Sequence, residues 1–198
     1  MTNTLDNSTA VNNSVINEGN PLRPDILTVS GYYFSFTEPG QSYISIDDIA
    51  HALSNLCRFA GHTRVFYSVA QHSVMVSRIV SSEARLAGLL HDAAEAYIGD
   101  VTTPLKMLLS QYREIERSVE KVIFNRFSIP DTLSPEIKHA DLRLLATERR
   151  DLMTDKTGAG TWPIIQDIEP LSEPIIPLSP KEASNLFLQE YEKIISEH

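Results

Sequence analysis

Two adjacent residues that could do chemistry, His91 and Asp92, interrupt an otherwise apolar stretch at residues 89–97. Apolar residues recur there at helical spacing and predict one helix from about residue 83 to residue 98. Positions three and four apart share a helix face, so Glu95 is expected to stand over both polar residues. Burying an imidazole beside a carboxylate is costly unless a partner compensates them, and a metal ion is one such partner.

Two further polar residues, His72 and Asp141, lie on the apolar faces of two other expected helices. Taken singly, His72 is better explained as a core histidine bonded to a carbonyl oxygen, and Asp141 could cap a loop or pair with a nearby arginine. Together with His91 and Asp92, they place two imidazoles and two carboxylates on three helices that face a common core. Mixed nitrogen and oxygen ligands suit zinc, manganese, iron or cobalt and exclude a thiolate-type site. The four residues therefore predict a divalent-metal site.

The elements that must position these residues are mainly helical. A β-branched and aromatic run around Ser30 predicts a small hairpin, and the proline-rich segment 162–180 predicts an extended strap. Ser45 and Ser179 are expected helix N-caps, the second in a capping box with Glu182. The expected helices span about residues 45–57, 69–80, 83–98, 102–127, 134–157 and 179 onward. The predicted fold class is mainly α, a helical bundle with a small N-terminal β-hairpin.

Length and composition fit one soluble domain. Residues 1–20, rich in Asn, Ser and Thr, are predicted to form a disordered tail, and residues 21–198 a single domain. The formal net charge of −9 argues against a nucleic-acid or acidic-membrane binder, since each favours a basic surface. Cys57 is the only cysteine, so no intrachain disulfide can form. With no membrane-length apolar run and no signal-peptide pattern, a cytoplasmic location is expected.

The order of a histidine, an adjacent His-Asp pair and a later aspartate resembles the signature of the HD superfamily of metal-dependent phosphohydrolases. The similarity covers roughly residues 45–155, and it resembles in particular the 5'-deoxynucleotidase branch and the phage members that hydrolyse dATP. Alarmone hydrolases of the superfamily carry a Glu-Asp pair where this chain has Glu95 and Ala96, which argues against that branch. The histidine pattern of two-metal cyclic-dinucleotide phosphodiesterases is not found either. The resemblance is carried by residues 66–74, 91–95, 99–106 and 140–148.

The resemblance implies a role for each matching residue. The implied metal ligands are His72, His91, Asp92 and Asp141. The implied catalytic acids, near the attacked phosphorus, are Glu95 and Asp100. The candidate substrate contacts are Arg58, Phe59, His62 and Lys106.

Each of these candidate substrate contacts also has a simpler structural explanation. Arg58 resembles a phosphate-contacting arginine but could instead complement a helix dipole. Lys106 is a plausible second phosphate cation and could equally be a solvated lysine. His62 could hydrogen-bond a phosphate or have a surface role. Phe59 could flank a base, although core packing explains most aromatic residues.

The function implied by the resemblance is hydrolysis of the 5' phosphoester of a deoxynucleotide. We expect dATP to be converted to deoxyadenosine and triphosphate, with dADP and dAMP as further candidate substrates. The alternatives are a 5'-deoxynucleotidase acting on monophosphates of several bases and a non-catalytic, metal-stabilised nucleotide sensor. The expected cofactor is zinc, cobalt or manganese, with magnesium as an additional ion. HD relatives commonly assemble, so a homo-oligomer is also expected.

Overall fold

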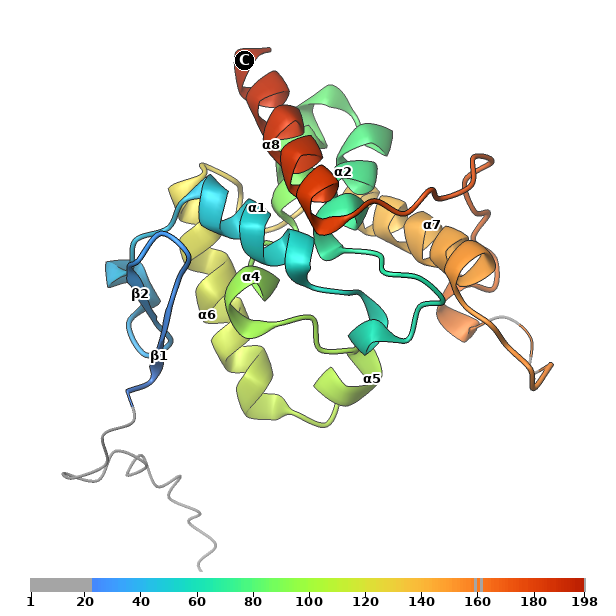
Figure 1. Cartoon of the computed structure of the whole chain (residues 1–198), viewed down its shortest axis with the longest axis horizontal. Helices are drawn as coiled ribbons and strands as arrows, with labels where there is room; N and C mark the ends of the chain where they lie inside the picture. The colour runs from blue at the N-terminus through green and yellow to red at the C-terminus, as the bar shows by residue number, and fades with distance from the viewer. Residues whose placement is uncertain (1–22, 159, 161, 198) are drawn as a thin grey trace, which may run out of the picture.

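The computed structural model describes residues 23–158, 160 and 162–197, which form a helical bundle with one small hairpin (Figure 1). The predicted fold class, mainly α with an N-terminal hairpin, is confirmed. The expected tail at residues 1–20 lies outside the described residues. The strands are β1 (Asp25–Leu27) and β2 (Tyr33–Ser35), and the 3-10 helices are η1 (Pro39–Gln41), η2 (Phe59–Gly61), η3 (Ser82–Ala84) and η4 (Pro163–Ile165). The α-helices are α1 (Ile46–Asn55), α2 (Val69–Ile79), α3 (Arg85–Leu90), α4 (Glu95–Ile98), α5 (Thr103–Lys106), α6 (Ser110–Arg126), α7 (Pro135–Leu152) and α8 (Pro180–Ser196).

The hairpin is fastened to the bundle by one aromatic residue and one buried carboxylate. Phe34 of β2 is fully buried and stacks on Tyr97, with ring centroids 4.0 Å apart. The backbone N–H and the hydroxyl of Ser30, in the turn, donate to Asp48 of α1 at 3.0 and 2.7 Å. The hairpin therefore covers one end of the core beside α1.

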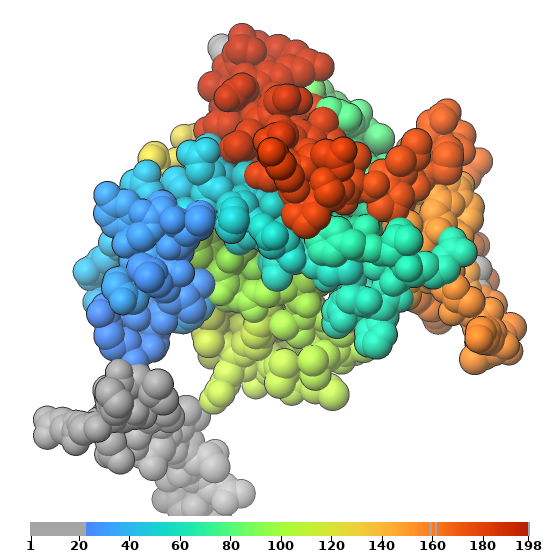
Figure 2. Space-filling model, in the orientation of Figure 1, coloured from blue at the N-terminus to red at the C-terminus, as the bar shows by residue number. Residues whose placement is uncertain are grey.

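The core lies where α1, α2 and α8 meet, and their caps follow the sequence. The Ser45 side chain accepts from the backbone N–H of Asp48, and Ser179 forms the expected capping box with Glu182. Helix α8 packs on both α1 and α2 and buries Phe187. Figure 2 shows α8 lying across α1 on one face of the molecule. Within the described ranges, no helix has the length and apolar character needed to cross a membrane.

The predicted continuous helix at residues 83–98 is wrong, because residues 91–94 form a turn between α3 and α4. Backbone bonds there run to the third preceding residue, from Ala93 to Leu90 and from Glu95 to Asp92, each at 3.0 Å. The His91 ring bonds the Gly88 carbonyl, which would accept the amide of residue 92 in an ideal α-helix. The backbone is therefore wound more tightly at residues 91–94, where His91 and Asp92 face inward.

Two other helix boundaries also differ from expectation. The helix expected at residues 102–127 is divided into α5 and α6 at residues 107–109. Met107 and Leu108 are exposed there, so no apolar contact favours a continuous helix across the junction. Helix α7 ends at Leu152, five residues before the expected end. The proline-rich segment expected as an extended strap contains η4, and residues 166–179 then reach α8 without a helix or strand.

The strap at residues 171–178 is held on the bundle by polar side chains of α2 and α7. Gln71 of α2 is 5% exposed, donates to the carbonyl of Ile176 at 2.8 Å and accepts from the N–H of Leu178 at 2.9 Å. Asp151 of α7 accepts from the N–H of Ile175 at 2.9 Å. The strap therefore joins α2 to α7, the two helices that carry His72 and Asp141.

We expect Gln71→Leu to lower the free energy of unfolding by about 1–3 kcal/mol, because it leaves strap backbone groups without their partners. Urea denaturation of the metal-free protein, followed by circular dichroism, measures this change. The exposed Gln111→Leu is the matched control and should stay within about 0.5 kcal/mol of the wild type. Equal effects of the two substitutions would show that the strap bonds do not stabilise the fold.

Candidate metal centre

Four predicted ligands come together where α2, the turn after α3 and α7 meet. One ligand atom from each of His72, His91 and Asp141 lies within 4.8 Å of the other two, so these three residues could hold a metal ion. Asp92 adjoins them, with its Oδ2 3.2 Å from the Nε2 of His91 and 3.7 Å from the Nε2 of His72. The helical faces inferred from the sequence thus converge on one point.

The two imidazole rings are oriented as metal ligands are. The Nδ1 of His72 lies 2.7 Å from Glu148 Oε1, and the Nδ1 of His91 lies 2.8 Å from the carbonyl oxygen of Gly88. Because neither oxygen can donate as a carboxylate or carbonyl, each Nδ1 carries a proton, and in the neutral imidazole each Nε2 is left with a lone pair. Both Nε2 atoms are buried and lack a hydrogen bond within the described part of the chain. Lone pairs beside carboxylate oxygens need a positive charge between them, and a metal ion fits this need.

The electrostatics of the site also favour a bound cation. Burial and the Arg58 charge lower the pKa of His72, but Glu148 and Asp141 outweigh them and raise it to about 9. Burial raises the pKa of Asp92, yet His91, His72 and Arg58 hold it well below the usual range. Burial likewise opposes ionisation of Asp141, and the two imidazoles hold the pKa of that carboxyl well below the usual range. The carboxylates therefore stay ionised and attract either a proton on His72 or a metal ion in its place.

Glu148 is the functional residue that the sequence did not reveal. It is fully buried, and besides His72 it binds Arg58, whose Nε lies 3.1 Å from Oε1 and whose Nη2 lies 3.2 Å from Oε2. The Nη1 of Arg58 is 3.6 Å from Asp92, so the guanidinium lies at the edge of the ligand set. Glu148 follows Asp141 by two helical turns on the same face of α7, which is the only signal the sequence carried.

The two predicted acids lie beside the ligands. Glu95 is 7% exposed, and its Oε2 is buried without a hydrogen bond to any described residue. Burial raises the pKa of Glu95 well above its usual value, and Asp92 and Asp100 raise it further. Burial also raises the pKa of Asp100, a carboxyl that senses the charges of Arg58, Asp92 and Lys106. Glu95 is thus the group at this site best suited to carry a proton at neutral pH.

The other predicted substrate contacts have different surroundings. The Phe59 ring lies beneath the Arg58 guanidinium, whose Cζ is 5.4 Å from the ring centroid. The Nζ of Lys106 is 2.5 Å from Glu116 and 3.5 Å from Glu95, so its charge is already paired at the edge of the site. His62 is exposed at the end of η2, and within the described ranges no polar contact joins its ring to the cluster.

Known proteins resemble this chain over long stretches, although no family model matches it. The protein YfdR of Escherichia coli strain K12, described as uncharacterized, is 44% identical over 168 residues, which cover 84% of this chain and 93% of YfdR. The Rhodobacter capsulatus protein RCAP_rcc00048, also described as uncharacterized, is 35% identical over 122 residues, or 57% of this chain and 62% of that protein. The first similarity therefore extends over most of both proteins rather than one motif.

We expect Glu148→Gln to weaken binding of zinc or cobalt by about 10- to 100-fold, because the carboxylate orients the His72 ring and makes it more basic. Isothermal titration calorimetry with each metal measures the change. Glu190→Gln is the matched control, since Glu190 is also buried and paired with two arginines but is absent from the ligand cluster. It should lower stability and leave metal affinity unchanged. An equal loss of affinity in both variants would contradict a specific role for Glu148.

Proposed function

We propose that this chain, which belongs to the same family as the Escherichia coli protein YfdR, is a metal-dependent phosphohydrolase of the HD type. The observation that carries the proposal is the pair of buried, unbonded Nε2 atoms of His72 and His91 beside the carboxylates of Asp92 and Asp141. The resemblance of these residues and their order to the HD signature supplies the reaction class. We propose a deoxynucleotide as substrate, cleaved at its 5' phosphoester.

The residues that would hold the metal are His72, His91, Asp92 and Asp141. Their mixed nitrogen and oxygen donors fit zinc, cobalt or manganese, and magnesium is proposed only as an additional ion. When bound, such a metal polarises a phosphoryl oxygen and lowers the pKa of bound water from about 15.7 toward 7.

The chain's own residues would supply the rest of the chemistry. Arg58 is held at the edge of the ligand set by Glu148 and Asp92, and a fixed guanidinium there stabilises negative charge on phosphoryl oxygens. Glu95, whose pKa is raised, can hold a proton at Oε2 and donate it to the leaving 5' oxygen of the deoxynucleoside. Asp100 would help to orient the attacking water.

The preferred substrate is dATP, giving deoxyadenosine and triphosphate, with dADP and dAMP as further candidates. This preference rests on the resemblance to the phage enzymes alone. A homo-oligomer is proposed from the resemblance to HD proteins, and light scattering of the purified protein tests it. A cytoplasmic location is proposed because a single cysteine fits a reducing compartment. A monophosphate-specific 5'-deoxynucleotidase and a non-catalytic nucleotide sensor are the rival functions.

A panel of deoxynucleotides, assayed with zinc, cobalt, manganese or magnesium, tests the proposal. We expect triphosphate release from dATP, and we expect Asp92→Ala to abolish turnover and metal uptake together because it removes a ligand. The exposed Asp131→Ala is the control and should leave both unchanged. Activity confined to monophosphates would favour the 5'-deoxynucleotidase, and no activity with any metal would favour the sensor. An active, metal-free Asp92→Ala variant would overturn the ligand assignment.

Glu95→Gln should separate proton transfer from metal binding. The amide keeps the size of the side chain but removes the proton donor, so we expect turnover to fall by about 10²- to 10⁴-fold with metal uptake retained. Steady-state kinetics and metal titration on the same preparation measure the two quantities. The exposed Glu114→Gln should change neither. Full activity of the Glu95→Gln variant would contradict the role of proton donor assigned to Glu95.

A further inference from the structure

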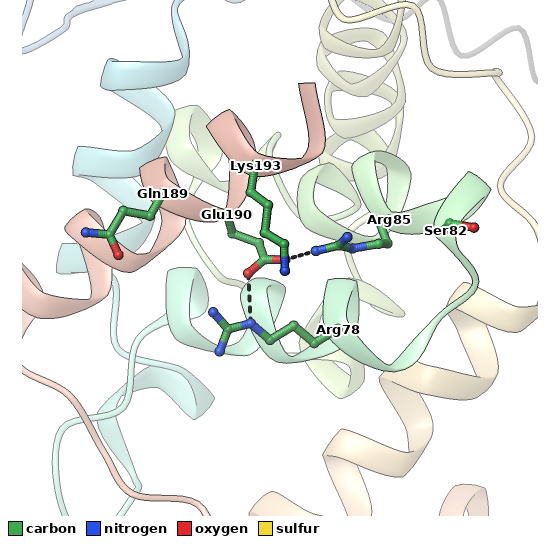
Figure 3. Close-up of a pocket in the computed structure, with 6 residues that line it drawn as sticks. All are labelled: Arg78, Ser82, Arg85, Gln189, Glu190 and Lys193. Carbon is green, nitrogen blue, oxygen red and sulfur yellow. Dashed lines mark hydrogen bonds and ion pairs between the residues drawn. The ribbon is translucent and has the colours of Figure 1, made fainter. Parts of the chain in front are cut away.

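A cavity of about 520 Å³ lies between α2, α3 and α8, lined by residues other than the metal ligands (Figure 3). Its volume is in the range of small-molecule binding sites. Arg78 comes from α2, Arg85 from α3 and Ser82 from η3. Gln189, Glu190 and Lys193 come from α8.

The lining of this cavity has the opposite charge to the chain as a whole. Arg78, Arg85 and Lys193 face one carboxylate, Glu190, whereas the whole chain carries a formal net charge of −9. With Glu197, which also pairs with Arg85, three cations face two carboxylates, and the net positive charge of one attracts a negatively charged ligand.

Glu190 holds two of these cations in place. It is 3% exposed, and it accepts from the Nε of Arg78 at 2.8 Å and from the Nη2 of Arg85 at 2.5 Å. Figure 3 shows both guanidinium groups converging on the Glu190 carboxylate. A second carboxylate, Glu197, accepts from the Nη1 of Arg85 at 2.6 Å. Both terminal nitrogens of Arg85 are therefore paired with glutamates of the protein, so this side chain stabilises the cavity wall.

Other donors remain available. Arg78 is half exposed and uses its Nε for Glu190, which leaves its terminal Nη groups without a bond in the described part of the chain. The Nζ of Lys193 makes no hydrogen bond or ion pair with any described residue, and the side chain is exposed. Arg78 and Lys193 thus offer a planar fork and a point charge, an arrangement that suits the several oxygens of a phosphoryl group.

We propose that this cavity is a second binding site, for a small molecule that carries phosphoryl groups, either an oligophosphate or a nucleotide. The volume exceeds that of a single phosphate ion, and the free donors match a charged chain of oxygens. The inference does not depend on the proposed function, since neither Arg78 nor Lys193 belongs to the candidate metal centre. Helix α2 carries both Arg78 and His72, so a ligand bound here contacts an element that also positions the metal ligands.

Calorimetric titration of metal-free, full-length protein with inorganic triphosphate tests the site. We expect Arg78→Gln combined with Lys193→Gln to weaken binding by about tenfold or more, the size of one lost charge-assisted hydrogen bond. The matched control, Lys121→Gln combined with Lys181→Gln, removes the same two charges from exposed positions outside the cavity and should leave binding unchanged. Thermal melts of each variant confirm that it is folded.

Two further variants decide where the triphosphate binds. Arg58→Gln removes the guanidinium at the edge of the candidate metal centre and should leave this binding intact. Glu190→Gln removes the buried negative charge and should strengthen it. The proposal is overturned if Arg58→Gln abolishes binding while the double cavity variant retains it, or if both double variants weaken binding equally. Tighter binding of dATP than of triphosphate would identify a nucleotide site, and equal binding an oligophosphate site.

Discussion

The candidate site depends on the buried negative charge of Glu148. A carboxylate with no exposed surface is stable only if its charge is paired and its oxygens are bonded, and Arg58 and His72 do both. This requirement fixes three parts of the chain at once: the loop after α1, the middle of α2 and the second half of α7. The ligand geometry follows, because His72 can turn its Nε2 toward Asp141 only when Nδ1 is held by Glu148.

The balance of charged side chains at the site also explains why it suits a metal cation. Arg58 pairs with Glu148 and Asp92, and Lys138 pairs with Asp141 at 2.8 Å. Two cations therefore face three carboxylates, which leaves one negative charge beside the two unbonded Nε2 atoms. Glu95 adds no further charge where its raised pKa keeps it protonated. A metal ion at the two unbonded Nε2 atoms would offset this negative charge and satisfy both lone pairs, whereas a proton on His72 satisfies only one of them.

The sequence predicted which polar residues come together better than it predicted the backbone that carries them. Helical periodicity is set by burial, so His72 and Asp141 could be placed on inward faces from their neighbours alone. The turn at residues 91–94 could not be predicted, because it depends on the His91 ring bonding the Gly88 carbonyl, a side-chain contact that leaves no mark in the periodicity. Periodicity put Glu148 on the same inward face as Asp141, but its role could not be predicted, because its partners Arg58 and His72 are distant in the sequence.

The two paired, buried glutamates illustrate how one type of interaction gives two kinds of site. Both oxygens of Glu190 are taken by Arg78 and Arg85, and within the described ranges this pairing leaves no buried nitrogen lone pair. The unbalanced charge around Glu190 is positive and lies toward solvent, which suits an anion. Glu148 instead shares its oxygens between an arginine and a histidine, so the far side of the His72 ring is left unbonded among carboxylates. The unbalanced charge around His72 is negative and buried, which suits a metal ion. Whether a buried glutamate is paired with two arginines or with one arginine and one histidine thus decides the sign of the charge that its surroundings still require.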